Sequence, residues 1–258
     1  MLQLLRVQIQ VINALIVRNI QSSQANLAMG FGWVFFDAFL GFAGLLIMKL
    51  AIRGYGGIPG VPTVTFLVSG LIPWLMFSSI YHIPDRAIKR GKSLLLLPMV
   101  TELDLILAAS FFTFMVYTIL FVVLAVCAAI YDGYGFPRFP LGIVLLFFSM
   151  GIMGMALGLI LMILTRLYAP AGKFVSFFMR FSMIISGVIF QVTMFPATIW
   201  PYLAWNPLLH VEELLRTYWF YSYRTPIGSP TYVIECMLGM MFFGLLIERY
   251  VRRRLPPS

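Results

Sequence analysis

Side chains that could carry proton or charge chemistry are scarce in this chain, and three of them share one expected helical face. His210, Glu213 and Arg216 follow one another at intervals of three residues, so on a helix they form a polar stripe. Tryptophan and tyrosine crowd this stretch, so the polar groups need partners or water. We expect an ion pair between Glu213 and Arg216, with His210 beside it.

A second cluster is basic. Arg86, Lys89 and Arg90 recur at spacings of three and four, which places them on one face of a helix. Asp85 follows a proline and favours a helix start, and a glycine after Arg90 favours its end. Two interpretations are open: these cations contact a partner protein, or they only fix the orientation of the chain in a membrane.

Two charged residues, Asp37 and Arg180, lie inside long apolar stretches. Ionisable groups at such positions are candidates for function because their burial in lipid is costly. The two side chains could pair across helices. Alternatively, Arg180 extends to the surface and Asp37 is hydrated.

Aromatic rings are abundant, with 24 Phe, 12 Tyr and 5 Trp. Such rings can stack on sugar faces, although most rings in a membrane bundle serve packing or contact lipid. The rings that we consider candidates for carbohydrate contact lie on the same two apolar stretches as Asp37 and Arg180. They are Trp33, Phe36, Phe177, Phe178 and Phe181.

The remaining polar residues do not suggest an enzyme. His82 and His210 are the two histidines and fall on opposite sides of the expected membrane, so they cannot build one metal site or catalytic pair. No nucleophile elbow, mid-membrane carboxylate pair or nucleotide-binding motif is present. Cys127 and Cys236 could form a disulfide or remain two buried thiols. We expect no catalytic residue, no metal and no cofactor bound by this chain.

The elements that must position these residues are membrane helices. Hydrophobic residues make up 61% of the 258 positions and charged residues 10%, whereas soluble domains have about 45–50% and about 25%. Six apolar stretches approach the ~20 residues that a bilayer-spanning helix needs. They lie near 33–52, 61–83, 103–131, 139–165, 174–195 and 231–248. We predict an all-α membrane protein with six transmembrane helices in a single domain, residues 1–258.

The basic residues predict the orientation. With the N-terminus in the cytoplasm, 13 of the 18 Lys and Arg residues fall on the cytoplasmic side. This positive-inside bias places both termini inside. The net charge of +9 then reflects topology and contact with anionic lipid, because nucleic-acid binding would need the cations on one solvated surface.

Two further elements flank the spans. Residues 1–20 repeat Leu and Ile at spacings of three and four, which predicts an amphipathic helix in the membrane interface or packed on the bundle. Residues 196–216 are aromatic and interrupted by proline, so we predict an outer re-entrant element between spans five and six.

Short patterns predict local contacts within the spans. Thr101 and Asp104 resemble a capping box at the start of span three. Gly154 and Gly158 permit close helix approach, either within the subunit or between subunits.

Three stretches together resemble a known family. They are residues 62–79 (PTVTFLVSGLIPWLMFSS), 86–104 (RAIKRGKSLLLLPMVTELD) and 206–216 (NPLLHVEELLR). In this order and spacing they resemble the ABC-transporter type 2 permeases that export polysaccharides, in particular the capsule polysaccharide exporter permeases of Gram-negative bacteria. The resemblance covers nearly the whole chain.

The resemblance implies a homodimer that works with two separate ATP-binding-cassette ATPases, which bind ATP and Mg²⁺. It maps an interface helix onto residues 1–20, a coupling helix onto 84–97 and the re-entrant element onto 196–216. Members often carry Glu-Pro in span one, where this chain has Asp37-Ala38, so a proline kink is not expected there.

The same resemblance suggests roles for the residues above. The substrate pathway would run between subunits along spans one and five. From their polar stripe among aromatic residues, and not from the resemblance, we expect His210, Glu213 and Arg216 to hold the outer element closed while no polymer is present. The residues expected to contact the ATPase are Asp85, Arg86, Lys89 and Arg90.

We therefore expect a permease of the bacterial inner membrane that moves a lipid-anchored capsular polysaccharide out of the cytoplasm, with periplasmic and outer-membrane export proteins as further partners. Export of O-antigen or a teichoic-acid-like polymer is an alternative, and a drug or lipid exporter is another. An ion-coupled secondary transporter or a membrane glycosyltransferase would be a different class. The absence of Asp, Glu, Lys and Arg from spans two and four, and of a polar catalytic cluster, counts against both.

Overall fold

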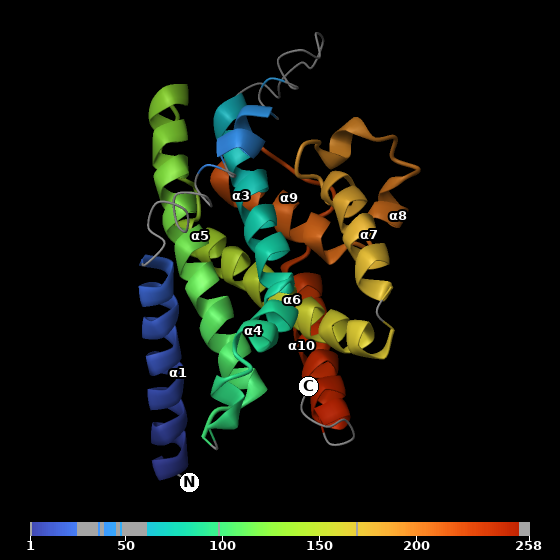
Figure 1. Cartoon of the computed structure of the whole chain (residues 1–258). Helices are drawn as coiled ribbons and strands as arrows, with labels where there is room; N and C mark the ends of the chain where they lie inside the picture. The colour runs from blue at the N-terminus through green and yellow to red at the C-terminus, as the bar shows by residue number, and fades with distance from the viewer. Residues whose placement is uncertain are drawn as a thin grey trace.

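The computed structural model describes residues 2–24, 36, 39–44, 47, 61–97, 99–168 and 170–252, and over these residues the chain is helical, without strands. The long helices form one bundle (Figure 1). They are α1 (Leu2–Gln24), α3 (Thr63–Tyr81), α5 (Glu102–Asp132), α6 (Pro140–Leu167) and α10 (Pro230–Arg252). The shorter helices are α4 (Ile83–Arg90), η1 (Leu94–Leu96), α7 (Ala171–Ile185), η2 (Val192–Met194), α8 (Trp200–Leu203) and α9 (Pro207–Trp219).

Helix α3 lies at the centre of the bundle, in contact with α5, α6 and α9. It is apolar on every face, a pattern typical of a helix surrounded by protein, and residues such as Leu67 and Ile72 are fully buried. The end of α5 holds its first turn, because the Thr65 amide and hydroxyl both donate to Asp132 Oδ2, at 2.8 and 2.7 Å. These contacts fix the position of α3, which contributes residues to both sites described below.

Glycines let α6 approach α3 closely. A Cβ atom on Gly154 would lie 3.1 Å from the Phe77 carbonyl oxygen, and one on Gly158 would lie 2.5 Å from that of Tyr81. The glycine pair therefore packs within the chain. This decides between the two interpretations that the sequence left open.

Four helices in the described part of the chain are long and apolar enough to cross a membrane: α3, α5, α6 and α10. They correspond to predicted spans two, three, four and six. Predicted span one, 33–52, lies largely outside the described residues. A total of six spans stays a prediction.

Predicted span five, 174–195, is shorter than expected. Helix α7 has 15 residues, which cover about 22 Å of the ~30 Å hydrocarbon core. The helix ends because Gly187 adopts a positive φ of 77° and the Arg216 side chain binds the next carbonyl, that of Val188. A glycine turn and a long-range contact thus end a helix that apolar periodicity alone would continue.

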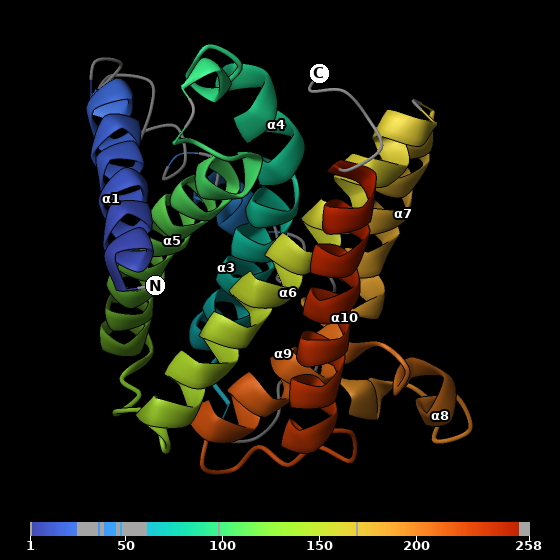
Figure 2. The same ribbon diagram turned by 90° about the horizontal axis from the view of Figure 1, so that it is seen from below.

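Helix α1 lies along the N-terminal half of α5 (Figures 1 and 2). Leu15 packs with Leu105 and Ala108, and Gln8 Nε2 donates to Asp104 Oδ1. The other oxygen of Asp104 accepts from the Thr101 amide and hydroxyl, both at 2.8 Å, within the expected capping box. Helix α1 therefore contacts its own bundle, and its position in a membrane interface stays a prediction.

The bundle has two distinct ends (Figure 2). Helix α4, the start of α5 and the end of α6 meet at one end, where Arg166 and Glu102 form an ion pair at 3.1 Å. We call this the α4 end. Helices α8 and α9 lie at the opposite end, which we call the α9 end.

Candidate functional site: a basic cavity and a buried charge network

At the α4 end, a cavity of about 510 Å³ lies between the α3–α4 junction, the end of α6 and the start of α7. Helix α4 turns away from α3 at His82, and Gly158 lets α6 approach this corner. The polar residues that line the cavity are Tyr81, His82, Asp85, Arg86, Thr165, Lys173, Ser176 and Arg180.

The cavity carries a net positive charge. Arg86, Lys173 and Arg180 contribute three cations against one carboxylate, that of Asp85. This carboxylate is already ion-paired with Lys89 at 2.7 Å. Burial, together with the nearby Arg86 charge, lowers the pKa of His82 to about 4, so its imidazole is neutral at pH 7. The arrangement suits an anionic group on a ligand.

The cavity brings together residues that the sequence assigned to separate roles. Asp85 and Arg86 of the expected ATPase contact lie beside Phe177 of the expected pathway and the apolar-stretch charge Arg180. Lys89 and Arg90 are exposed on the outer surface of α4. The ATPase-contact role of these residues stays a prediction.

The aromatic residues of α7 are mostly uncovered, because this helix packs mainly against α6. Phe177, Phe178 and Phe181 are each at least half exposed, and the rings of Phe177 and Phe181 meet edge to face at 4.9 Å. Phe36 is also exposed. Trp33 and Asp37 lie outside the described residues, so the pairing of Asp37 with Arg180 stays a prediction.

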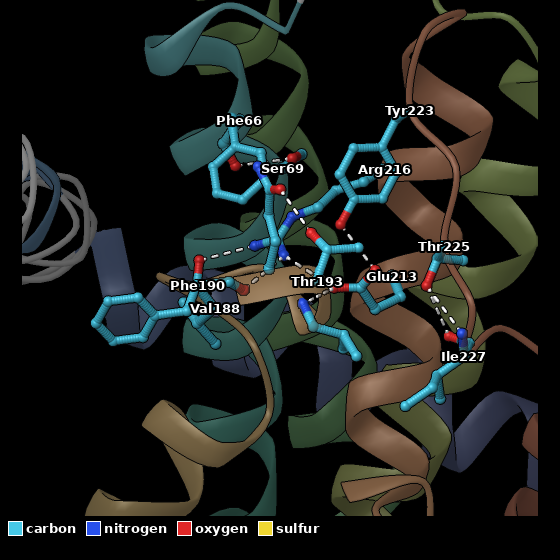
Figure 3. A network of polar contacts seen from close by, with 12 residues as sticks. Phe66, Ser69, Val188, Phe190, Thr193, Glu213, Arg216, Tyr223, Thr225 and Ile227 are labelled. Carbon is cyan, nitrogen blue, oxygen red and sulfur yellow. Dashed lines mark hydrogen bonds and ion pairs between the residues drawn. The ribbon is translucent and has the colours of Figure 1, made fainter. Parts of the chain in front are cut away.

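At the α9 end, Arg216 is fully buried. Its Nη2 donates to the Val188 carbonyl at 2.8 Å, and its Nη1 donates to the Phe190 carbonyl at 3.2 Å. The guanidinium also lies over the Phe66 ring, 3.9 Å from the ring centroid (Figure 3). One side chain of α9 therefore connects the central helix α3 to the segment that follows α7.

Glu213 completes this network. Its Oε1 accepts from the Val192 amide at 3.2 Å, and its Oε2 accepts from the Tyr223 hydroxyl at 2.7 Å (Figure 3). Its carboxylate also lies 3.7 Å from Arg216 Nη1, with both side chains fully buried. The expected ion pair is present, but it lies in the protein interior rather than at an exposed interface.

His210 does not join that pair, contrary to the stripe expected from its spacing. Its Nδ1 accepts from the Ser229 amide at 3.2 Å, which leaves Nε2 to donate to the Ala204 carbonyl at 2.9 Å. Its ring also packs on Tyr232, with centroids 4.7 Å apart. His210 therefore ties α9 to the segments before α9 and α10, because nearby backbone groups provide better-placed partners.

Two residues of this network were missed as site residues by the sequence analysis. Among the described residues, neither oxygen of the buried Glu212 has a hydrogen-bond partner, and neither does Arg216 Nε. Burial raises the pKa of the Glu212 carboxyl, although the Arg216 charge opposes this shift. A Cβ atom on Gly70 would lie 2.7 Å from Arg216 Nη2, 2.8 Å from the Val188 carbonyl oxygen and 3.3 Å from Glu212 Oε2.

The signals for these residues were indirect. Glu212 and Glu213 are adjacent acids in an apolar, aromatic stretch, and Gly70 is a glycine inside a helix that is otherwise apolar. Elsewhere, Cys127 is exposed, Cys236 is half-buried, and both are free thiols. They do not form a disulfide, and they are not two buried thiols, so both interpretations of the sequence were wrong. The described residues contain no cluster of three or more His, Cys, Asp or Glu side chains that could hold a metal.

No family model matches the chain. Relatives are found along nearly its whole length. The polysialic acid transport protein KpsM of Escherichia coli is 28% identical over 246 residues, which cover 94% of both chains. The chain is a homologue of capsule export proteins.

Two further relatives extend this result. The capsule polysaccharide export inner-membrane protein CtrC of Neisseria meningitidis is 26% identical over 257 residues, covering 100% of this chain and 97% of the relative. The capsule polysaccharide export inner-membrane protein BexB of Haemophilus influenzae is 23% identical over 256 residues, covering 99% and 96%. The match to CtrC therefore spans the segments that form the basic cavity and the charge network.

Proposed function

We propose that the protein is the permease subunit of an ATP-binding-cassette exporter that moves a capsular polysaccharide from the cytoplasm across the inner membrane. The end-to-end similarity to relatives named for capsule polysaccharide or polysialic acid export carries this proposal. The four membrane-length helices support it. ATP and Mg²⁺ would bind to a separate ATPase.

The basic cavity is the proposed entry point for the polymer. Arg86, Lys173 and Arg180 provide donors for acidic groups, whether on sugars or on a lipid-linked end. Polysialic acid, for which one relative is named, is an acidic polymer. The neutral His82 adds a polar group without adding charge.

The pathway would continue along α7 in a homodimer. Phe177 lines the cavity. Phe178 and Phe181 follow on the same helix, and all three rings are exposed. Sugar faces can slide along such rings because each stacking contact is weak and does not depend on one hydrogen-bond pattern. The second subunit would cover the other side of the polymer.

Helix α4 is the proposed link to the ATPase. Lys89 and Arg90 are exposed for contact with a partner, whereas Asp85 and Arg86 on the same short helix line the cavity. A displacement of α4 by the ATPase would therefore change the shape and charge of the cavity. Periplasmic and outer-membrane export proteins would receive the polymer on the other side.

Deletion of the gene in the source bacterium tests the proposal. Capsular polymer should be lost from the cell surface and accumulate in the cytoplasm, and wild-type protein should restore export. Inactivation of ATP hydrolysis in the partner ATPase should give the same phenotype. A normal surface capsule in the deletion strain would contradict the proposal, and accumulation of O-antigen or a teichoic-acid-like polymer would assign a different glycan.

A further inference from the structure

Glu212 and Arg216 are placed to form an ion pair that the structure does not contain. They lie four residues apart on α9, a spacing at which opposite charges normally meet on a helix surface. In the described part of the chain, Arg216 instead pairs with Glu213 and two carbonyls, and Glu212 makes no hydrogen bond. Both side chains are fully buried.

Arg216 binds the segment between α7 and η2, residues 186–191, which we call the joint. Gly187 has a positive φ of 77°, and the carbonyls of Val188 and Phe190 directly after it are bound by one guanidinium. Glu213 binds the Val192 amide in the same segment. The C-terminal end of α7 is therefore fixed to α9 through these polar contacts.

Gly70 provides the space in which Arg216 could change partners. Arg216 Nη2 and Glu212 Oε2 lie 2.7 and 3.3 Å from the position that a Cβ atom of Gly70 would occupy. Because Gly70 has no side chain, both polar groups lie close to the same position beside α3. The two groups are therefore close neighbours beside the same glycine.

We propose that Arg216 is a positioning residue with two alternative sets of partners. In the first, it binds the carbonyls of Val188 and Phe190 and holds the C-terminal end of α7 in place. In the second, it pairs with Glu212 and releases that end. The assignment of α7 to a polymer pathway rests on the proposed function, but the exchange itself does not.

Each arrangement leaves a different group without its partner. In the held arrangement, the Glu212 carboxyl and Arg216 Nε lack hydrogen bonds. In the released arrangement, the ion pair with Glu212 forms, and the carbonyls of Val188 and Phe190 lose their donor. Neither arrangement satisfies every buried polar group, which is the condition for an exchange with a small difference in free energy.

Cysteine labelling of the joint tests the exchange. Val188 is fully buried, so Val188→Cys should react slowly with a water-soluble maleimide in full-length protein whose Cys127 and Cys236 have been replaced by alanine. Arg216→Gln should raise the resting labelling rate about tenfold, because the carbonyls lose their donor. Glu212→Gln should lower it about tenfold, because the released arrangement loses its ion pair.

The double variant distinguishes exchange from simple relief of a buried acid. If Arg216 pairs with Glu212 on release, Glu212→Gln should have no effect once Arg216→Gln is present. An equal effect of Glu212→Gln with and without Arg216 would overturn the proposal, as would no effect in either background. Ala108→Cys on α5, also fully buried, should stay unlabelled in every variant and reports global unfolding.

Arg216→Lys provides a second variant if Arg216→Gln unfolds. Lysine can pair with Glu212 but lacks the planar fork whose two nitrogens bind the two carbonyls. Labelling at position 188 should therefore rise and remain sensitive to Glu212→Gln. Insensitivity would count against the exchange. These measurements need no ATP and no polymer, so failure of the proposed transport function would leave their result unchanged.

Discussion

Arg180 differs from a surface cation because it shares a cavity with Arg86 and Lys173. Cations gathered in a concave site act together on one anion, because their fields add there. The residue can therefore be tested through its charge alone, with little change to the fold.

Arg180→Gln should weaken export of an acidic polymer. Loss of one charge-assisted hydrogen bond, worth about 1.5–3 kcal/mol, lowers affinity about ten- to hundredfold, whereas Arg180→Lys should retain most of the effect of the charge. Export is measured as surface polymer at low expression of the permease. Lys92→Gln is the matched control, because Lys92 is exposed like Arg180 but does not line the cavity. Equal export by the two glutamine variants would contradict a role for the cavity in binding.

His82 should make stability depend on pH. Its pKa is lowered from 6.5 to about 4 by burial and the Arg86 charge, so the unfolded chain binds a proton more readily than the folded one. Stability should be full above about pH 6.5 and fall as pH decreases toward 4. Thermal unfolding of the purified protein between these values should be less pH-dependent in His82→Gln. An unchanged pH profile would contradict the role of His82.

Gly70→Ala should destabilise the protein. The added methyl group would meet Arg216 Nη2, the Val188 carbonyl and Glu212, and overpacking of this kind costs about 1–3 kcal/mol. Gly239→Ala in α10 is the control, because nothing lies within 4 Å of its Cβ position. There, alanine should be neutral or stabilise the helix by about 0.5–1 kcal/mol. Thermal unfolding of both variants measures the difference, and equal midpoints would show that the contact around Gly70 can relax.

At the scale of the element, α4 presents two surfaces with different roles. Ile83, Pro84 and Ile88 are buried, whereas Lys89 and Arg90 are exposed. The ion pair of Lys89 with Asp85 is exposed and contributes about 0.3–0.5 kcal/mol. Charges on the outer surface can thus be reversed without a large loss of stability.

Reversal of the outer charges, Lys89→Glu with Arg90→Glu, should reduce copurification of the ATPase and export of polymer while the protein still inserts into the membrane. Arg86 is left unchanged because it lines the cavity. The competing interpretation is that these charges only fix topology. Restoring two cations at neighbouring positions would then recover export, and such a recovery would contradict a contact with the ATPase.

Elements defined by local signals were predicted well from the sequence. The capping box at Thr101 and Asp104 and the four long apolar helices follow from contacts near in sequence or from composition. The end of α7 was not predicted. Gly187 is a local stop signal, but the contact that accompanies it joins Arg216 to a carbonyl 28 residues away. Glu212 was missed for the same reason, because its lack of a hydrogen-bond partner depends on the position of the Arg216 side chain.

At the scale of the whole molecule, the site was predicted as separate residues rather than as one place. Helical spacing identified Arg86, and its place inside an apolar stretch identified Arg180. Only the packing of α4 and α7 against α6 brings the two residues to one cavity. Distances between helices depend on tertiary packing, for which a single sequence offers few signals.

The two ends of the bundle should face opposite compartments. Lys92, beyond α4, and Tyr202, in α8, are both exposed and lie toward the α4 end and the α9 end respectively. In a chain without other cysteines, Lys92→Cys should react with an impermeant maleimide only from the cytoplasm, and Tyr202→Cys only from outside. A crossed result would reverse the orientation predicted from the basic residues.

The contact between α1 and α5 has a consequence for synthesis of the chain. Gln8 and Asp104 are 96 residues apart, so α1 leaves the ribosome long before its docking site exists. At about 5–20 residues per second, this interval lasts roughly 5–20 s. An amphipathic helix without a partner binds the nearest apolar surface, which for a nascent membrane protein is the bilayer itself. Helix α1 would thus first hold the nascent chain at the membrane. It would join the bundle only after α5 has been inserted.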